Sequence, residues 1–335
     1  MKNFAFSTLA ILFSSPSWSE NHRLPLVPEN VHWGYFDAGV KPVLRIASGD
    51  VVELETMIAR GLDRLYLAGA REDEIPQPIR LVESEVSERG PGPHPLTGPI
   101  EIAFAEPGDV LEIRVEAVDL WIPIGVCGFL PEGGTIPDEF PYGGLQLFRL
   151  DLSSKTASIR PGVDVPLAPF FGTIGVAPPK LRGRVSSGPP AAHGGNLDLK
   201  ELVAGTALFL PVHVPGALLS IGDGHAAQGD GEVSGTAIET FLKGRIRVVL
   251  HKDRRRLLWP RVETPTHYIT VGLDPDLDQA ARIATSEMVR FFTEEKGLTR
   301  DEAYILSSVA VDLRVTQLVD GTKGIHAMAA RSLFR

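Results

Sequence analysis

Short runs of alternating or β-branched apolar residues dominate the chain as far as about residue 275. Examples are Val43 to Ile46, Val51 to Thr56, Glu101 to Phe104 and Val110 to Val115. A period of two is typical of strands with one buried face, and Gly and Pro between the runs mark turns. The 34 Gly and 27 Pro residues fit this picture. The pattern predicts antiparallel sheets in a sandwich or barrel-like arrangement.

A helical pattern comes only near the C-terminus. Residues 276–293 repeat apolar side chains at spacings of three and four before Gly297, which predicts an amphipathic helix. Thr299, with Glu302 three residues later, has the spacing of a capping box and predicts a second helix over residues 303–310. The expected fold class is therefore α+β, predominantly β, with about two C-terminal helices.

Proline and glycine are concentrated in residues 161–195. Because proline removes a helical hydrogen bond and clashes with the preceding turn, regular helix is excluded through most of this stretch. We interpret it as a connecting or active-site loop. It separates an N-terminal β-rich subdomain, residues 20–160, from a C-terminal α+β subdomain, residues 196–335, that carries the main polar site.

Residues 1–19 have the pattern of a secretory signal peptide. Lys2 is followed by an apolar run from Phe4 to Phe13 and by small residues up to Ser19. The run is shorter than the ~20 apolar residues that a membrane-spanning helix needs. We expect cleavage near Ser19 and an exported protein, periplasmic or secreted.

Composition narrows the classes of partner. The hydrophobic content of 43% is that of a globular chain, and the formal net charge is −9. Nucleic acids and anionic membranes are bound through clustered Lys and Arg, so we expect neither as a partner of the mature protein. The one basic cluster, Lys252 with Arg254 to Arg256, is interpreted as a solvated turn. Cys127 is the only cysteine, and its apolar surroundings favour a buried small hydrophobe over a nucleophile.

The densest polar stretch is GDGHAAQGDGE, residues 222–232. Residues two apart in a strand share a face, so Asp223 and His225 point the same way, as do Gln228, Asp230 and Glu232. An imidazole beside carboxylates is a ligand set of zinc or a similar divalent ion, whereas oxygen ligands alone suit calcium. Gly-Asp-Gly stretches also form ordinary turns, but the density of polar groups favours a catalytic or metal site.

Three other stretches carry candidate polar groups. Asn196 and Asp198 lie two apart after a double glycine, and His94 lies between prolines in a rigid turn. Glu263 and His267 follow at the expected end of a strand. The sequence leaves open whether His94 or His267 belongs to the site.

Seven stretches in this order carry a family resemblance. They are WGYFD (33–37), HPLTGP (94–99), EPGD (106–109), GVAP (175–178), GGNLD (194–198), LPV (210–212) and residues 222–232. Together they resemble the acetamidase/formamidase family of short-chain amide hydrolases. The resemblance implies a β-rich α+β fold, a homo-oligomer, and metal-dependent hydrolysis of small linear amides to a carboxylate and ammonia. Residues 121–150 carry none of these motifs, and a signal peptide departs from the family's cytoplasmic setting.

The resemblance and the polar pattern together suggest residue roles. We expect a divalent ion, zinc with calcium as the alternative, to be held by Asp198, Asp223, His225 and Asp230. The expected catalytic residues are Glu232, Asn196, Gln228 and His94. A bound ion lowers the pKa of its water from 15.7 to ~7 and polarises a carbonyl. Glu232 is then expected to carry the proton to the departing ammonia, while Asn196 or Gln228 bonds the amide or its oxyanion.

Other chemistries have less support. A Gly-x-Ser-x-Gly elbow is missing, Ser186-Ser187-Gly188 lacks the fuller pattern of amidase-signature enzymes, and Cys127 lacks the partners of a nitrilase nucleophile. The alternative from another class is an exported, non-catalytic protein that binds a small amide or carboxylate on the same scaffold. The acids and histidine of residues 223–232 favour the enzyme, because a simple binder has less need of them all.

Overall fold

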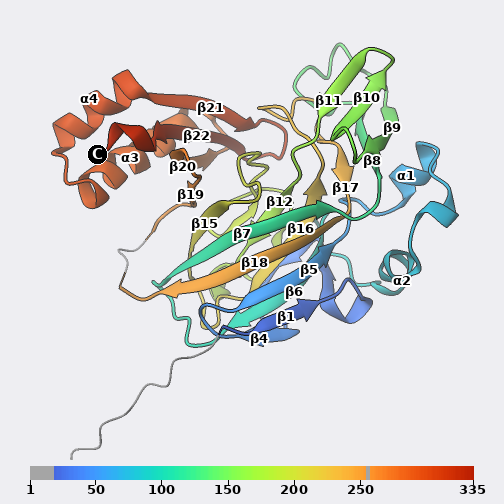
Figure 1. Ribbon diagram of the computed structural model, residues 1–335, viewed down its shortest axis with the longest axis horizontal. Helices are drawn as coiled ribbons and strands as arrows, with labels where there is room; N and C mark the ends of the chain where they lie inside the picture. The colour runs from blue at the N-terminus through green and yellow to red at the C-terminus, as the bar shows by residue number, and fades with distance from the viewer. Residues whose placement is uncertain (1–18, 254–256) are drawn as a thin grey trace, which may run out of the picture.

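The computed structural model describes residues 19–253 and 257–335. Two large β-sheets form the body of the molecule, and helices lie at its periphery (Figure 1). The predicted α+β, predominantly β class is confirmed, and no sheet of the described residues closes into a barrel. The predicted signal peptide, apart from Ser19, and Arg254 to Arg256 of the basic cluster lie outside the described residues.

The first sheet has nine strands. In spatial order they are β1 (Asn21–Leu24), β5 (Val51–Thr56), β18 (Leu242–His251), β7 (Val110–Leu120), β15 (Thr206–Pro211), β19 (Arg261–Glu263), β20 (His267–Asp274), β22 (Lys323–Ala330) and β21 (Val311–Gln317). Neighbours are antiparallel, except that β1 runs parallel to β5. The predicted strand Val51 to Thr56 is β5 itself, and Val110 to Val115 forms the first half of β7.

The second sheet has eleven strands. Its main path is β11 (Val163–Pro166), β10 (Thr156–Arg160), β9 (Gly144–Asp151), β8 (Ile124–Phe129), β17 (Glu239–Thr240), β16 (Leu219–His225), β12 (Phe170–Gly175) and β14 (Gly194–Asn196). A branch from β16 holds β6 (Pro95–Ile102), β2 (Val31–Trp33) and β4 (Leu44–Ile46), and a separate pair joins β3 (Tyr35–Phe36) to β13 (Val185–Ser186). The strands β9, β10 and β11 form an arm at one edge of the sheet, shown in green at the upper right of Figure 1.

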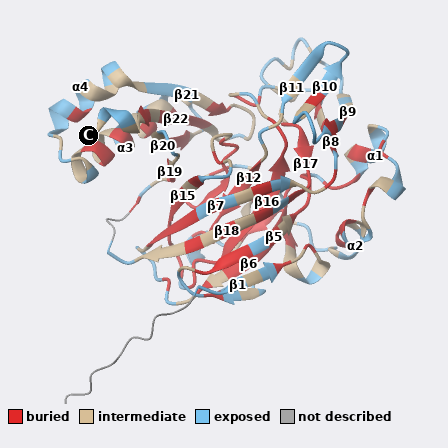
Figure 2. Ribbon diagram, in the orientation of Figure 1, coloured by how far each residue is buried: buried red, intermediate tan, exposed pale blue. Residues whose placement is uncertain are grey.

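The main hydrophobic core lies between the two sheets. Val52, Ile113 and Ile246 from the first sheet meet Ile174 and Ile221 from the second, and all five are 0% exposed. Burying an Ile or Val side chain contributes about 1.5–3 kcal/mol. Figure 2 shows the buried residues running along the strands in the middle of the molecule. The core therefore fixes the strand register on which the polar site depends.

Two C-terminal helices, α3 (Leu277–Glu295) and α4 (Arg300–Ala310), confirm the helical pattern. Asp276 caps α3, and Thr299 with Glu302 forms the predicted capping box of α4. Ala284 and Met288 pack α3 against β20 and β22. These caps and the apolar stripe explain why the helices form where the pattern places them.

Shorter helices were not predicted. They are α1 (Asp63–Leu67), α2 (Gln77–Glu85), η1 (Pro28–Asn30), η2 (Glu72–Glu74), η3 (Lys180–Arg182) and η4 (Arg331–Leu333). Each is too short for a helical period to stand out in the sequence. In the described part of the chain, no helix is long and apolar enough to cross a membrane.

The Pro- and Gly-rich stretch, residues 161–195, contains a central strand as well as loops. β12 lies within it and pairs with both β16 and β14. Its backbone brings Gly172 and Thr173 to the polar site described below. The division of the chain into two subdomains around this stretch stays a prediction.

Candidate active site

A buried group of acids and histidines, here named the carboxylate centre, lies at the end of β16. Its members are His94, Asp198, Asp223, His225, Glu232, Glu239 and Asp320. Strand pairing accounts for part of the assembly, because His225 on β16 lies opposite Glu239 on β17. Asp223 lies on β16 as well, whereas His94, Asp198, Glu232 and Asp320 lie on loops, so the full centre exists only in the folded chain.

His225 is held by bonds at both ring nitrogens. Its Nδ1 lies 2.9 Å from Gln228 Oε1, and the amide nitrogen of Gln228 donates to the backbone oxygen of Asp198 at 2.7 Å. The amide therefore turns its oxygen toward the ring, and Nδ1 carries the hydrogen. Nε2 faces Asp223 Oδ1 at 3.3 Å and Glu239 Oε2 at 3.4 Å, and these two acids outweigh burial and raise the pKa of His225 well above its usual value.

Three candidate ligand atoms face one another: His225 Nε2, Asp223 Oδ1 and Glu239 Oε2. All three lie within 4.8 Å of one another. Apart from His225 Nε2, neither oxygen has a hydrogen-bond donor among the described residues, and both side chains are 3% exposed. An unsatisfied buried acceptor costs about 1–3 kcal/mol. The arrangement therefore requires a proton or a cation between these atoms.

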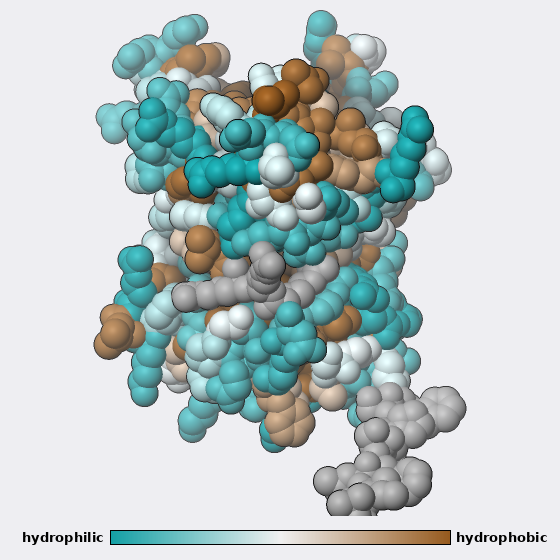
Figure 3. Space-filling view, turned by 90° about the vertical axis from the view of Figure 1, so that its left-hand side faces the viewer, coloured by the Kyte–Doolittle hydropathy of each residue, from teal (hydrophilic) through white to brown (hydrophobic). Residues whose placement is uncertain are grey.

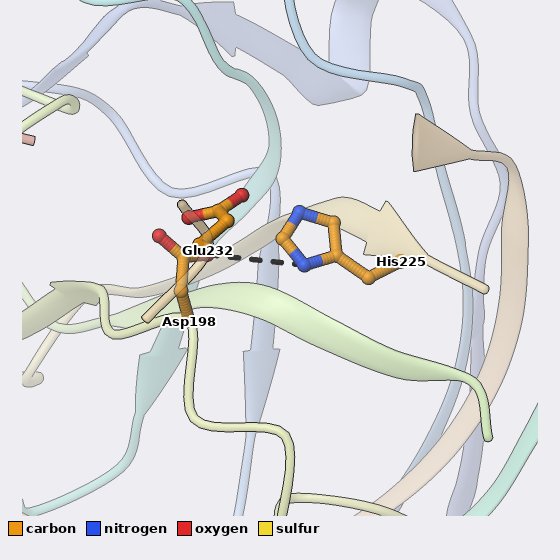
Figure 4. Close-up of side chains that lie close together, drawn as sticks. All are labelled: Asp198, His225 and Glu232. Atoms are coloured by element: carbon orange, nitrogen blue, oxygen red, sulfur yellow. Dashed lines mark ion pairs between the residues drawn. The ribbon is translucent and has the colours of Figure 1, made fainter. Parts of the chain in front are cut away.

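On the other side of the ring, the carboxyl groups of Asp198 and Glu232 lie side by side and point toward His225 (Figure 4). Asp198 Oδ1 is 3.9 Å from His225 Nδ1 and has no hydrogen-bond partner among the described residues. Burial, together with repulsion from Glu232 and Asp320, raises the pKa of Asp198 well above its usual value. Burial likewise raises the pKa of Glu232 against the opposing effect of His225. The pair therefore retains a proton.

His94 and Asp320 complete the centre. His94 Nδ1 donates to the Ser187 carbonyl at 2.9 Å, and Nε2 lies 3.6 Å from Asp223 Oδ2. Burial lowers the pKa of His94 despite the nearby Asp223, so this ring is neutral and presents a lone pair to the centre. Burial also raises the pKa of Asp320 to about 7, although Asp198 bonds to it.

The carboxylate centre has an excess of negative charge. Among the described residues no Lys or Arg forms an ion pair with any of its five acids. Arg64 interacts with Glu239 through charge without an ion pair, and its guanidinium has no hydrogen-bond partner in the described part of the chain. Acids packed together without cations are the setting in which a metal ion binds strongly.

Gly172 lets the backbone of β12 approach the centre closely. A Cβ at this position would lie 2.5 Å from Asp223 Oδ2, 2.6 Å from Asp198 Oδ1 and 2.8 Å from His225 Cε1. Any side chain here would collide with the two carboxylates and the imidazole. The arrangement of these three groups therefore depends on a glycine at residue 172.

Three acids of the centre have strained backbones. Asp198, Asp223 and Glu232 have φ values of 48°, 60° and 47°, in the left-handed region that costs an L-residue roughly 1–2 kcal/mol. Such strain persists only where the surrounding structure enforces it, and it collects at functional sites. Its occurrence at three members of one centre indicates that the backbone is held in place to position their carboxylates.

The structure brings most of the predicted site residues together. His94, Asp198, Asp223, His225 and Glu232 belong to the centre, and Gln228 bonds directly to His225. Asn196 is connected to the centre through Thr173, whose Oγ1 lies 2.7 Å from Asn196 Oδ1 and 3.2 Å from Asp223 Oδ2 as a shared donor. Asp230 lies apart and pairs with Lys200, and the ring of His267 bonds to Thr266.

Sequence reasoning missed four contributors. Glu239, Asp320, Gly172 and Thr173 lie in stretches with no dense polar pattern. A short strand around Glu239 could have been foreseen, but its pairing opposite His225 depends on the fold of the second sheet. For the other three we find no signal in the sequence.

Asp230 belongs to a second group, here named the compensated cluster. It contains Glu201, Asp230 and His326, whose candidate ligand atoms also lie within 4.8 Å of one another, together with Lys200 and Arg314. Lys200 Nζ lies 2.8 Å from Asp230 Oδ1, and Arg314 lies 3.3 Å from both Asp230 Oδ2 and Glu201 Oε1. Each acid here has its own cation.

Comparisons with known proteins bear on the identity of the chain. The sequence model of the acetamidase/formamidase family matches residues 90–185 and 184–329. The chain belongs to the acetamidase/formamidase family. The resemblance carried by the seven stretches is therefore confirmed, and so is the β-rich α+β fold that it implies.

Individual relatives support the same family. The chain is similar to an acetamidase structure from Bacillus halodurans, at 32% identity and a TM-score of 0.79 over 93% of this chain and 98% of that one. An acetamidase structure from Yersinia enterocolitica gives 29% identity and 0.80 over 96% and 95%. A formamidase of Methylophilus methylotrophus is 28% identical over 52% of this chain and 57% of its own length. The chain spans about half the length of the curated relatives that it matches.

Proposed function

We propose that this protein hydrolyses the C–N bond of linear amides to a carboxylate and ammonia, with a divalent metal ion in the carboxylate centre. The observation that carries the proposal is the convergence of His225 Nε2, Asp223 Oδ1 and Glu239 Oε2, three buried candidate ligand atoms within 4.8 Å of one another that no Lys or Arg of the described residues pairs with. The acetamidases and formamidase to which the chain is similar support the class of reaction.

Asp223, His225 and Glu239 would hold the ion. One imidazole nitrogen with two carboxylate oxygens is a common zinc ligand set, whereas calcium takes six to eight oxygen ligands, so zinc is favoured. Of the four ligands predicted from the sequence, this keeps Asp223 and His225 and replaces Asp198 and Asp230 by Glu239. When bound, the ion would lower the pKa of a water molecule and polarise the amide carbonyl.

Glu232, paired with Asp198, is the proposed general acid and base. An amide nitrogen is a poor leaving group until it is protonated, and a carboxyl whose pKa is raised toward neutrality can take and return a proton. Asp198 is 1% exposed, whereas Glu232 also lines a cavity that a substrate can enter. Glu232 therefore reaches the substrate, and Asp198 keeps the shared proton beside it.

Gln228 and Asn196 act mainly as positioning residues in this proposal. Both ends of the Gln228 side chain are bonded within the protein, which fixes the hydrogen on His225 Nδ1 and frees Nε2 for the ion. Asn196 orients Thr173, which in turn bonds Asp223. Contact of either amide group with the substrate stays a prediction.

Ammonia release from acetamide, with metal content measured on the same samples, tests the proposal. Chelation should abolish turnover, and zinc should restore it. Glu239→Gln should lose the metal and the activity, whereas Glu232→Gln should keep the metal and lose activity by about 10²–10⁴-fold. Glu53→Gln, an exposed control, should behave as the wild type. The reverse pattern, with metal lost only in Glu232→Gln, would assign the ion to Asp198, His225 and Glu232 instead.

The same experiment separates the enzyme from the non-catalytic alternative. A binding protein would be stabilised against heat by acetamide without releasing ammonia, because a ligand that prefers the native state raises its apparent stability. Such a result, in protein that retains its metal, would reject the hydrolase.

We also propose that the chain is exported and forms a homo-oligomer. The C-terminal helices present exposed apolar side chains, among them Ile305 (65%) and Val309 (75%), beside β21, the edge strand of the first sheet. Figure 3 shows hydrophobic surface gathered at the top of this face, where the helices lie. Light scattering of the wild type and of Val309→Asp tests assembly, and N-terminal sequencing of the secreted protein tests cleavage near Ser19.

A further inference from the structure

A cavity of about 670 Å³ borders the carboxylate centre. Glu232 and Gln228 line it, with the proposed acid–base carboxyl on one side and the amide that holds His225 on the other. The cavity therefore gives a substrate direct access to the proposed catalytic carboxyl.

Most of the remaining lining is apolar. Phe148, Ile159 and Val165 come from the arm formed by β9, β10 and β11, and they face Ala227 and Ile238. Four of these five side chains belong to one hydrophobic cluster. The arm therefore supplies an apolar wall beside the polar centre. Binding pockets for small molecules are mostly apolar and contain a few polar groups that fix the orientation of the ligand.

Apart from Glu232, the charged groups at the cavity are already paired. Lys200 and Asp230 bond each other at 2.8 Å, and Glu201 pairs with Arg314. Binding a charged group here would mean breaking these pairs, so the cavity favours an uncharged occupant. It is also far larger than formamide or acetamide requires, since cavities of roughly 300–1,000 Å³ hold drug-sized ligands.

We propose that this cavity receives the acyl group of the substrate and that the enzyme prefers primary amides with a bulky, uncharged, apolar acyl chain. The inference rests on the proposed amide hydrolysis and adds the substrate class. Residues 121–150, which lie outside the seven stretches named above, contribute Phe148 and Cys127 to the lining. The lining therefore comes partly from outside these stretches and partly from residues 227–232.

The test is the specificity constant kcat/KM for formamide, acetamide, butanamide and hexanamide. Each methylene buried in the cavity should raise kcat/KM about fourfold, so hexanamide, with four more methylenes, should exceed acetamide by on the order of 10²-fold. If acetamide is cleaved as well as or better than hexanamide, the acyl cavity is wrong while the hydrolase stands. If no amide in the series releases ammonia, the proposed function fails and this inference fails with it.

Two variants of the cavity lining test whether the acyl group binds in this cavity. Ile159→Asp places a charge on the apolar wall and should lower the hexanamide-to-acetamide ratio of kcat/KM at least tenfold. Leu181→Asp puts the same charge on a fully exposed residue outside the cavity and should leave the ratio unchanged. Ala168→Phe, at an exposed position of the lining, should lower the ratio by filling space, with Ala47→Phe as its control. An unchanged ratio in both cavity variants would show that the acyl group binds elsewhere.

Discussion

The carboxylate centre and the compensated cluster contain similar groups with opposite electrostatics. Both place carboxylates and a buried histidine within reach of a single ion. In the compensated cluster Lys200 and Arg314 pair with the acids, whereas no such cation pairs with the acids of the centre among the described residues. Ligand spacing is therefore common to both groups, and the charge balance distinguishes a candidate metal site from a structural ion-pair network.

The pKa shifts show the same difference. Burial works to raise the pKa of Glu201, but His326 and Lys200 outweigh it and hold that pKa below its usual value. In the centre, burial and neighbouring acids together raise the pKa of Asp198. A buried acid with a partner stays ionised, and a buried acid among acids takes up a proton or a cation.

Alanine substitutions of His225 in the carboxylate centre and of His326 in the compensated cluster, made one at a time, should give the largest contrast between the two groups. His225→Ala should lose the metal and lower kcat/KM by roughly 10³-fold or more, since even a residue that only supports a ligand is worth about 10–100-fold. His326→Ala should keep the metal and most of the activity but lose about 2 kcal/mol of stability, because Thr316 loses its partner. Metal analysis and urea unfolding measure both. Metal loss in His326→Ala would erase the distinction between the groups.

A side chain added at Gly172 should have the next largest effect, because it would displace the groups of the centre. Gly172→Ala introduces a methyl group between Asp198, Asp223 and His225, and we expect a loss of roughly 10²-fold in kcat, as for misplacement of reacting groups by about 1 Å. Gly143→Ala, where a Cβ makes only ordinary contacts, is the matched control. Full activity in Gly172→Ala would mean that the reacting groups do not meet at this point.

The ion pairs of the compensated cluster should make the stability of the fold depend on pH. The folded-state pKa of Glu201 lies below the ordinary 4.5, so its ionised form stabilises the fold above that pH and the contribution is lost as the pH falls through the folded pKa. Glu201→Gln should therefore cost about 1 kcal/mol at neutral pH and progressively less as the pH falls below the ordinary pKa of the carboxyl. Urea unfolding across this range measures the difference, and a constant difference would contradict the assignment.

The smallest effect is expected at Arg314. Its side chain is 43% exposed, so solvent screens its pairs with Glu201 and Asp230, and Arg314→Met should cost less than about 1 kcal/mol. In this variant Lys200 is the one remaining Lys or Arg that pairs with an acid of the cluster among the described residues. Titration with zinc provides the sharper measurement: new zinc binding in Arg314→Met, absent from the wild type's compensated cluster, would show that the cations alone keep this group from holding an ion.

The fold was largely readable from local patterns. The alternation of apolar and polar residues predicted β5 and the first half of β7. The apolar spacing that follows Asp276 and the capping box at Thr299 predicted α3 and α4. Short elements such as α1 escaped because five residues cannot display a helical period. The strand β12 escaped recognition because it lies inside a Pro- and Gly-rich stretch that favours loops.

The candidate site was readable only where its residues are neighbours in sequence. Asp223 and His225 lie two apart on one strand, so their shared face follows from the pleat. Asp230 follows the same spacing, yet it turns toward Lys200 and Arg314. The glycine-rich turn after β16 breaks the alternation, and the period of two no longer predicts direction.

The sequence by itself determined the fold class, the family and the stretch that supplies the histidine of the centre, because these depend on local periodicity and ordered motifs. Only the tertiary structure decided which acids surround His225, since Glu239, Asp320 and Gly172 arrive through strand pairing and loop closure between distant segments. It also decided which acids have cations beside them. Burial and charge balance are properties of space, and a linear pattern of residues does not encode the distances on which they depend.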